Sequence, residues 1–240
     1  MGAEGILRLV LKNQSKIFEI IIEDMEVRVK ICCISSIEEA NLAIKYGASA
    51  LGLVGKMPSG PGVIDDVLIR KIVEAVPPPI STFLLTSETN ANDIIAHYQK
   101  VHTSTIQMVD YVDHKEYEKI RVALPHVKLV QVIHVIDEES VVEAIEISQY
   151  VDALLLDSGN PNLPIKELGG TGRAHDWNLS KKIRESVNIP VFLAGGICKD
   201  NVNKAIEVVK PFGVDLCSSV RSGGKISETK LNEFFRAIQF

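Results

Sequence analysis

The sequence predicts an α/β protein with a single domain, a (β/α)8 TIM barrel, preceded by a short amino-terminal extension. Short β-branched runs alternate with amphipathic runs eight times between Val27 and Phe240, which is the number of units in a closed (β/α)8 barrel. No linker or low-complexity segment interrupts residues 27–240, so one domain is expected there. The first turn, Cys32 to Ser36, has no glycine, which disfavours an open doubly wound sheet.

Each predicted strand is a short apolar run between loop residues, as in the buried strands of parallel sheets. In chain order the strands cover residues 27–32, 50–54, 81–85, 105–109, 128–134, 152–157, 190–194 and 214–218. The helix-compatible runs that follow them cover residues 37–46, 65–75, 91–100, 114–124, 138–150, 179–186, 199–210 and 227–237.

Residues 1–26 are harder to interpret. Two apolar runs, 6–11 and 17–22, flank Asn13-Gln14-Ser15, so a hairpin and an amphipathic helix both fit. Met25 stands just before the first predicted strand, so the segment is also compatible with an appendage from an upstream start codon. No function is assigned to it.

The composition is that of an ordinary globular protein. The chain has 240 residues, of which 46% are hydrophobic and 24% charged, and no apolar run approaches the roughly 18 residues that span a bilayer. The net charge is -5 and no basic cluster is present. These features argue against nucleic acid or an anionic membrane as the main partner and favour a small metabolite.

Four cysteines are too few and too irregularly spaced for a secreted disulfide framework; they are Cys32, Cys33, Cys198 and Cys217. Charged residues interrupt the apolar amino-terminal stretch, which is wrong for a signal peptide. A reducing cytoplasm is therefore the expected location. Neither the cysteines nor the six histidines show metal-ligand spacing, so no metal site is predicted.

The sixth predicted strand ends in an acidic residue. Alternation places Ala153, Leu155 and Asp157 on one face, with the carboxylate at the strand's carboxyl end, where barrels of this type do their chemistry. A glycine-rich loop, 169–172, then leads to Trp177, and its glycines permit a close approach to a ligand. Asp157 is either a catalytic acid below a ligand-closing loop or a cap of the next segment.

The first strand ends in two cysteines. Val29 and Ile31 are expected to face the helices, which points Lys30 and Cys32 into the barrel mouth and Cys33 outward as packing. Cys32 is then a candidate catalytic thiol, or simply a small buried hydrophobe.

Glycine and hydroxyl residues follow the seventh and eighth strands. The loops after these strands commonly bind a phosphate in this fold. Gly195 and Gly196 permit close approach, and Ser218 and Ser219 add hydroxyl donors. A phosphate site is predicted here, the alternative for each loop being a plain turn.

Five motifs in order carry a family resemblance. They are Lys30-Ile31-Cys32, Leu155-Leu156-Asp157-Ser158, Gly169-Gly170-Thr171-Gly172 through Trp177, Leu193-Ala194-Gly195-Gly196, and Gly213-Val214-Asp215 with Ser218-Ser219. From Val27 onward the chain resembles the phosphoribosylanthranilate isomerase family. The resemblance implies a cofactor-free aldose–ketose isomerase, an intramolecular oxidoreductase of tryptophan biosynthesis. Such an enzyme converts N-(5-phosphoribosyl)anthranilate to the 1-deoxyribulose 5-phosphate aminoketose by an Amadori rearrangement.

The resemblance also implies roles for individual residues. Cys32 would be the general base that takes the C2′ proton, and Asp157 the general acid that protonates the furanose oxygen. The remaining residues would bind the substrate and its phosphate; they are Gly195, Gly196, Ser218 and Ser219 at the phosphate, Gly170 and Gly172 in the closing loop, Gln107 on the fourth strand, and Asp215, whose role is open. The oligomeric state is open between a monomer and a homodimer.

The chain departs from the family pattern on the aglycone side. Cys33 replaces a usual glycine, and the loop 58–63 lacks the arginine that contacts the anthranilate carboxylate. A histidine is missing after Gln107, and His134 stands where an arginine is common. Two alternatives therefore stay open: an isomerase for another phosphoribosylamine, and a non-catalytic barrel that binds a phosphosugar. Lys56, Lys30 or His134 would be a substitute carboxylate ligand; Lys30 is also a candidate to lower the pKa of Cys32 or to form an interior ion pair.

Overall fold

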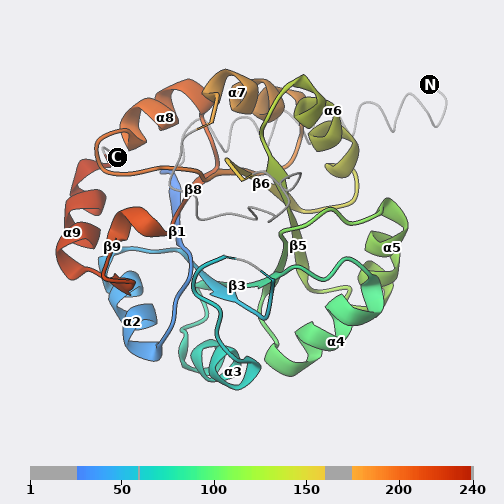
Figure 1. The fold of residues 1–240 in the computed structure, drawn as a ribbon, viewed down its shortest axis with the longest axis horizontal. Helices are drawn as coiled ribbons and strands as arrows, with labels where there is room; N and C mark the ends of the chain where they lie inside the picture. The colour runs from blue at the N-terminus through green and yellow to red at the C-terminus, as the bar shows by residue number, and fades with distance from the viewer. Residues whose placement is uncertain (1–25, 59, 160–174, 239–240) are drawn as a thin grey trace, which may run out of the picture.

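The computed structural model describes residues 26–58, 60–159 and 175–238, so the predicted boundary of the extension at residue 26 is not tested. Eight parallel strands close into a barrel in the order of the chain, and the last pairs with the first. Figure 1 shows the helices arranged as a ring around these strands. The predicted (β/α)8 barrel is confirmed.

The strands of the barrel lie close to their predicted positions. They are β1 (Arg28–Ile31), β2 (Ala50–Val54), β3 (Ser81–Thr86), β4 (Thr105–Met108), β5 (Lys128–His134), β6 (Ala153–Asp157), β7 (Val191–Leu193) and β8 (Gly213–Leu216). The helices are α2 (Ile37–Tyr46), α3 (Asp66–Ala75), α4 (Ala91–Val101), α5 (His114–Ala123), α6 (Glu138–Ile147), α7 (Trp177–Ser186), α8 (Val202–Val209) and α9 (Glu228–Ala237).

Alternation along the strands divides the core into two layers. On β6, Ala153 and Leu155 belong to the barrel interior, whereas Leu154 and Leu156 pack in the layer between the strands and the helices. The same division holds on β1, where Val29 and Ile31 face the helices. A side chain that ends an interior row therefore points into the mouth of the barrel.

Polar caps begin most of the helices. The side chains of Ser36, Asp65, Asn90, Asp113, Asp137, Asp176 and Ser227 each accept a backbone N–H of the first helical turn. Each such cap is worth about 0.5–2 kcal/mol. Because every helix start follows the carboxyl end of a strand, the caps also anchor the loops of the face where barrel sites are built.

The segment after β8 differs from the prediction. The strand ends at Leu216, two residues early, and Ser218–Val220 form a 3-10 turn, η1. A short hairpin of β9 (Arg221–Ser222) and β10 (Lys225–Ile226) follows. Similarly, α8 begins at Val202 and not at Lys199, after a turn in which the Val202 N–H bonds to the Cys198 carbonyl.

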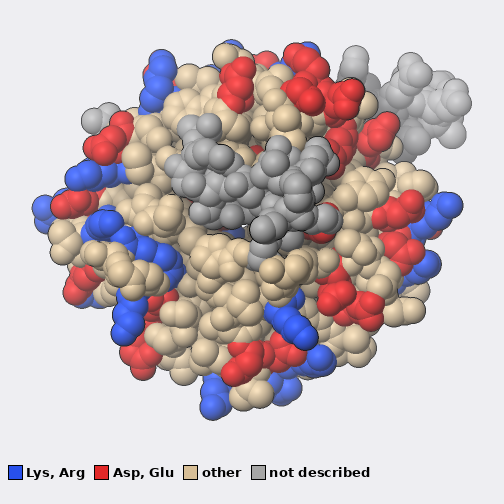
Figure 2. Space-filling view, in the orientation of Figure 1, with Lys and Arg blue, Asp and Glu red and all other residues tan. Residues whose placement is uncertain are grey.

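The visible face of the barrel carries both signs of charge. Acidic and basic side chains alternate around its periphery, and mostly uncharged residues lie nearer its centre (Figure 2). None of the helices among the described residues is long and apolar enough to cross a bilayer.

Candidate active site

A pocket of about 740 Å³ empty volume opens at the carboxyl ends of the strands. Eight of the ten site residues named from the sequence line it: Cys32, Gln107, Asp157, Gly195, Gly196, Asp215, Ser218 and Ser219. The other two, Gly170 and Gly172, lie outside the described residues. Strand ends far apart in the sequence are thus brought to one cavity, as the barrel architecture requires.

Asp157 is the last residue of β6 and is 7% exposed. Its Oδ1 accepts the backbone N–H of Ser158 at 2.7 Å, so the carboxylate does make a local turn contact. It also lines the pocket. Asp157 therefore makes the local turn contact and also lines the cavity.

His175 lies near this carboxylate. Burial lowers the pKa of the His175 imidazole, and the charges of Asp157 and Asp176 act in the opposite direction. Its Nε2 contacts the Ser180 hydroxyl, and a Cβ built on Gly195 would lie 3.1 Å from its Nδ1. No periodicity or spacing in the sequence singles out this histidine, because its neighbours Asp157 and Gly195 come from β6 and from the loop after β7.

Lys30 forms an ion pair inside the barrel. Its Nζ lies 2.9 Å from Oδ1 of Asp215, and the two side chains are 0% and 8% exposed. Burial opposes the charge of Lys30, but the Asp215 carboxylate, together with Cys32 and Cys33, outweighs it and raises the lysine's pKa. Burial raises the pKa of Asp215, against the attraction of Lys30. Of the roles considered for Lys30, the ion pair is present.

Cys32 packs beside this pair. A Cβ built on Gly52 of β2 would lie 2.9 Å from the Cys32 Sγ and 3.1 Å from the Lys30 Nζ. Real Cβ atoms do not approach a neighbour at 2.9 Å, so only glycine leaves room for both groups. The ammonium of Lys30 is therefore held next to the thiol by β2 packing and by Asp215.

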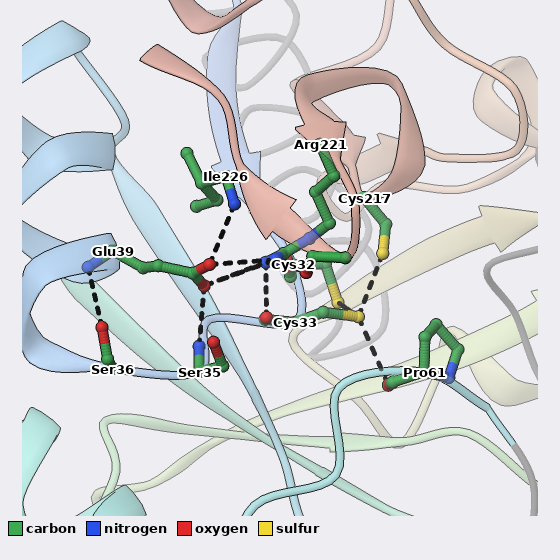
Figure 3. A network of polar contacts seen from close by, with 10 residues as sticks. Cys32, Cys33, Ser35, Ser36, Glu39, Pro61, Cys217, Arg221 and Ile226 are labelled. Carbon is green, nitrogen blue, oxygen red and sulfur yellow. Dashed lines mark hydrogen bonds and ion pairs between the residues drawn. The ribbon is translucent and has the colours of Figure 1, made fainter.

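Cys33 does not face outward, and that prediction was wrong. The strand ends at Ile31, and Cys33 takes a left-handed φ of 62°, so the alternation of faces no longer applies. Its Sγ lies 3.8 Å from the Cys32 Sγ and 3.1 Å from the Cys217 Sγ, and 3.5 Å from the Pro61 carbonyl oxygen (Figure 3). Cys33 and Cys217 both line the pocket.

A buried arginine holds the turn that carries these cysteines. The Arg221 guanidinium, on β9, donates to the carbonyl oxygen of Cys32 at 3.1 Å and also to that of Cys33. Glu39 of α2 pairs with Arg221 at 3.2 Å (Figure 3). Burial would raise the pKa of Glu39, but backbone N–H donors of Ile226 and Ser35, together with Arg221, lower it. No sequence signal joins residues 182 positions apart, so this pair could not be predicted.

The two loops predicted to bind a phosphate both reach the pocket. Gly195 and Gly196 have φ values of 77° and 66°, which favour glycine at both positions. Asn201 fixes their loop, since its side chain donates to the Gly196 carbonyl oxygen at 2.9 Å and accepts the Cys198 N–H at 2.8 Å. In the neighbouring loop after β8, the buried Ser219 Oγ has no hydrogen-bond partner among the described residues.

The opposite wall is apolar. Val54, Met57, Leu85, Val109 and Val132 line it, and the Oε1 of Gln107 lies in the same cavity without a partner among the described residues. This hydrophobic wall suits an aromatic ring.

The three residues considered as substitute ligands for the anthranilate carboxylate lie in different environments. Lys56 is exposed, Lys30 is paired with Asp215, and the His134 Nε2 contacts the Val109 carbonyl oxygen at 3.1 Å. Among the described residues that line the pocket there is no lysine, arginine or histidine.

The geometry agrees with what comparison with known families finds. The family model for N-(5'phosphoribosyl)anthranilate (PRA) isomerase matches residues 29–237, which is the whole barrel. The chain belongs to the phosphoribosylanthranilate isomerase family.

Individual members of the phosphoribosylanthranilate isomerase family match over nearly the whole barrel. N-(5'-phosphoribosyl)anthranilate isomerase 2 of Methanosarcina mazei is 35% identical over 210 residues, covering 87% of this chain and 92% of its own. The crystal structure of the Thermotoga maritima enzyme is 27% identical with a TM-score of 0.76, covering 88% of this chain and 98% of its own.

A further crystal structure of this family holds a small molecule. It is a phosphoribosyl anthranilate isomerase in complex with reduced 1-(o-carboxyphenylamino)-1-deoxyribulose 5-phosphate. It is 25% identical to this chain with a TM-score of 0.73, and covers 88% of this chain and 98% of its own.

Proposed function

We propose that this chain converts N-(5-phosphoribosyl)anthranilate to the 1-deoxyribulose 5-phosphate aminoketose, the Amadori rearrangement of tryptophan biosynthesis. The observation that carries the proposal is one pocket that gathers Cys32, Asp157 and both phosphate-type loops in a barrel that matches the family over residues 29–237. A family member binds a reduced form of the aminoketose. A cytoplasmic location belongs to this proposal.

The phosphate would lie between the loops after β7 and β8. Gly195 and Gly196 let backbone N–H groups approach an anion closely. Ser218 and Ser219 supply hydroxyls, and the unpartnered Ser219 Oγ is available to a phosphate oxygen. Backbone and hydroxyl donors bind phosphate without a cation, which fits the pocket as it stands.

Asp157 would open the sugar ring. As the general acid it gives a proton to the furanose oxygen, so that the C1′–O bond breaks and an iminium ion forms. The carboxyl group stands at the end of the interior row of β6, after Leu155, where it lines the pocket. The buried His175 is close enough for the two charges to interact.

Cys32 would then take the C2′ proton. The acidity of that proton comes from the neighbouring iminium ion, and its removal gives an enolamine that tautomerises to the ketone. A thiol acts as a base only as a thiolate. The buried Lys30 ammonium, held by Asp215 and packed with Cys32 against Gly52, is the positive charge beside this thiol.

The apolar wall would hold the aromatic ring of the aglycone. Val54, Leu85 and Val132 are among the side chains that would contact it. Because no lysine, arginine or histidine is among the described lining residues, the carboxylate of anthranilate has no evident partner there. This observation favours, as a second candidate, an isomerase that acts on another phosphoribosylamine.

Turnover of freshly prepared N-(5-phosphoribosyl)anthranilate, followed by fluorescence, tests the proposal. Loss of a positioned acid or base typically costs about 10²- to 10⁴-fold in rate. Cys32→Ser and Asp157→Asn are expected to lose activity on this scale. Their matched controls are Cys198→Ser and Asp200→Asn, which change residues outside the pocket lining.

The result that overturns the proposal is full activity in both Cys32→Ser and Asp157→Asn. Binding of a sugar phosphate without turnover of any phosphoribosylamine would instead indicate the non-catalytic barrel. The second candidate is tested with the phosphoribosyl adduct of aniline, which lacks the carboxylate. A charge-assisted contact contributes roughly 1.5–3 kcal/mol, about ten- to a hundredfold in affinity, so equal kcat/KM for both adducts would show that the carboxylate is not recognised.

A further inference from the structure

Three cysteine sulfurs meet at the edge of the pocket, and two of them come from opposite ends of the barrel sequence. The Sγ of Cys33 is 3.1 Å from that of Cys217 and 3.8 Å from that of Cys32. Barrel closure causes this meeting, because β1 pairs with β8 and the Cys32 N–H bonds to the Leu216 carbonyl oxygen at 2.7 Å. Neither Cys33 nor Cys217 has a role in the proposed reaction.

The pair has the geometry that precedes a disulfide. Cys33 and Cys217 stand just beyond the ends of β1 and β8, two strands that pair side by side. The sulfurs would have to close by about 1 Å to reach the bond length of roughly 2.05 Å. Cys32 and Cys33, by contrast, are neighbours in the chain, and bridging them would require a strained ring across one peptide bond.

The two thiols differ in exposure and in charge preference. Cys217 is half-buried and Cys33 is buried. The contact with Cys33 lowers the pKa of Cys217, and Arg221 acts in the same direction against burial. The same contact raises the pKa of Cys33. Cys217 is therefore the more accessible and more easily ionised sulfur, with Cys33 in place to react with it.

We propose that Cys33 and Cys217 form a modification site at which a hydroperoxide oxidises the two thiols to a disulfide. The Cys217 thiolate attacks one peroxide oxygen, and the O–O bond breaks. The other oxygen departs as hydroxide and takes up a proton to become water, so that Cys217 becomes a sulfenic acid. Cys33 then attacks that sulfur; the S–O bond breaks, the S–S bond forms, and the proton of Cys33 leaves with the departing oxygen as a second water. In sum, two thiols and one hydrogen peroxide give one disulfide and two waters.

The disulfide would disturb both sides of the pocket. Cys33 adjoins Cys32, and its Sγ would leave the Pro61 carbonyl oxygen, which lies 3.5 Å away in the loop after β2. Cys217 adjoins Ser218 in the predicted phosphate loop. A misplacement of about 1 Å can cost roughly 100-fold in rate, so oxidation is expected to lower turnover at least about tenfold. This consequence rests on the proposed function, whereas the disulfide itself does not.

Peptide mapping tests the bond directly. The reduced, full-length protein is treated with hydrogen peroxide, remaining thiols are capped with N-ethylmaleimide, and tryptic peptides are analysed by mass spectrometry. Trypsin places Cys32 and Cys33 in peptide 31–45, Cys217 in 205–221 and Cys198 in 185–199. The expected product joins peptides 31–45 and 205–221, and fragmentation assigns Cys33 as the bridged residue. A bond from Cys32, or sulfinic acids without a crosslink, overturns the proposal.

Variants connect the bond to activity. Cys33→Gly removes one thiol and suits the left-handed φ, and Cys217→Ser removes the other; Cys198→Ser is the matched control. Wild type and Cys198→Ser are expected to lose activity with peroxide and to regain it with dithiothreitol, while the other two variants keep their own untreated rates. Crosslinking without any change in rate would refute the effect on the pocket. Crosslinking in a protein that never turns over N-(5-phosphoribosyl)anthranilate would contradict only the proposed function.

Discussion

Replacing Lys30 by methionine is the sharpest test of how the barrel interior is held together. Lys30 is fully buried and its ammonium lies 2.9 Å from Asp215, which is also nearly buried. The substitution keeps most of the side-chain volume but leaves the Asp215 carboxylate without its partner. Removing one member of a buried ion pair typically costs about 3–5 kcal/mol, and we expect a loss of unfolding free energy in this range.

Comparison with an exposed ion pair separates the effect of burial on stability from the effect of charge. Lys45 and Glu228 are 2.8 Å apart, with side chains 65% and 54% exposed. Exposed pairs contribute little to stability because water screens their charges, so Lys45→Met is expected to unfold at nearly the same urea concentration as wild type. The double variant Lys30→Met with Asp215→Leu removes both buried charges, and it is expected to recover most of the loss. Equilibrium urea unfolding gives the midpoint and slope, and from them the unfolding free energy, of wild type and the three variants.

The effect of Lys30→Met also has a predicted pH dependence. Without the lysine, burial raises the folded-state pKa of Asp215 above its unfolded value. Folding then favours the protonated carboxyl, so the contribution of Asp215 to stability is present at low pH and is lost as the pH rises through the folded pKa. The variant's deficit should therefore be smaller at pH 5 than at pH 8. A deficit below about 1 kcal/mol, or a double variant less stable than the single one, would refute the reasoning.

Two further predictions concern the surroundings of Cys32. Gly52→Ala would place a Cβ 2.9 Å from the Cys32 Sγ, so we expect a loss of about 1–3 kcal/mol in a thermal or urea melt. A variant as stable as wild type would contradict the close packing at Gly52. Glu39 has a lowered pKa in the fold, so its stabilising contribution is present above its unfolded pKa and is lost as the pH falls through the folded value. Glu39→Gln should therefore flatten the acid limb of stability against pH, and an unchanged acid limb in urea melts across that range would count against the Arg221 network.

Much of the barrel could be read from local sequence. The strand and helix positions follow from short-range periodicity, and a strand's alternation alone points Asp157 and Cys32 into the mouth. The phosphate-type loops followed from glycine and serine at the ends of the last two strands. The strand positions and the meeting of strand ends at one pocket are confirmed, because each depends on a few neighbouring residues and on one rule about where strand ends meet. Phosphate binding by the two loops stays a prediction.

Other features depend on contacts that no local pattern encodes. The alternation rule failed at Cys33, since the strand had already ended and the backbone turned left-handed. The β9 and β10 hairpin was not foreseen, and so neither was the buried Arg221 that it carries to Glu39 and to the cysteine carbonyls. His175 gained its place beside Gly195 only through the packing of neighbouring strand ends.

The sequence by itself determined the family, the order of the barrel elements and the residues expected to carry the reaction. Tertiary structure decided which side chains pair with which: Lys30 with Asp215, Arg221 with Glu39, and Cys33 with Cys217. Each of these pairs joins the region of β1 and α2 to that of β8 and β9. Their partners are distant in sequence, and closure of the barrel between β1 and β8 is the physical event that brings them within reach.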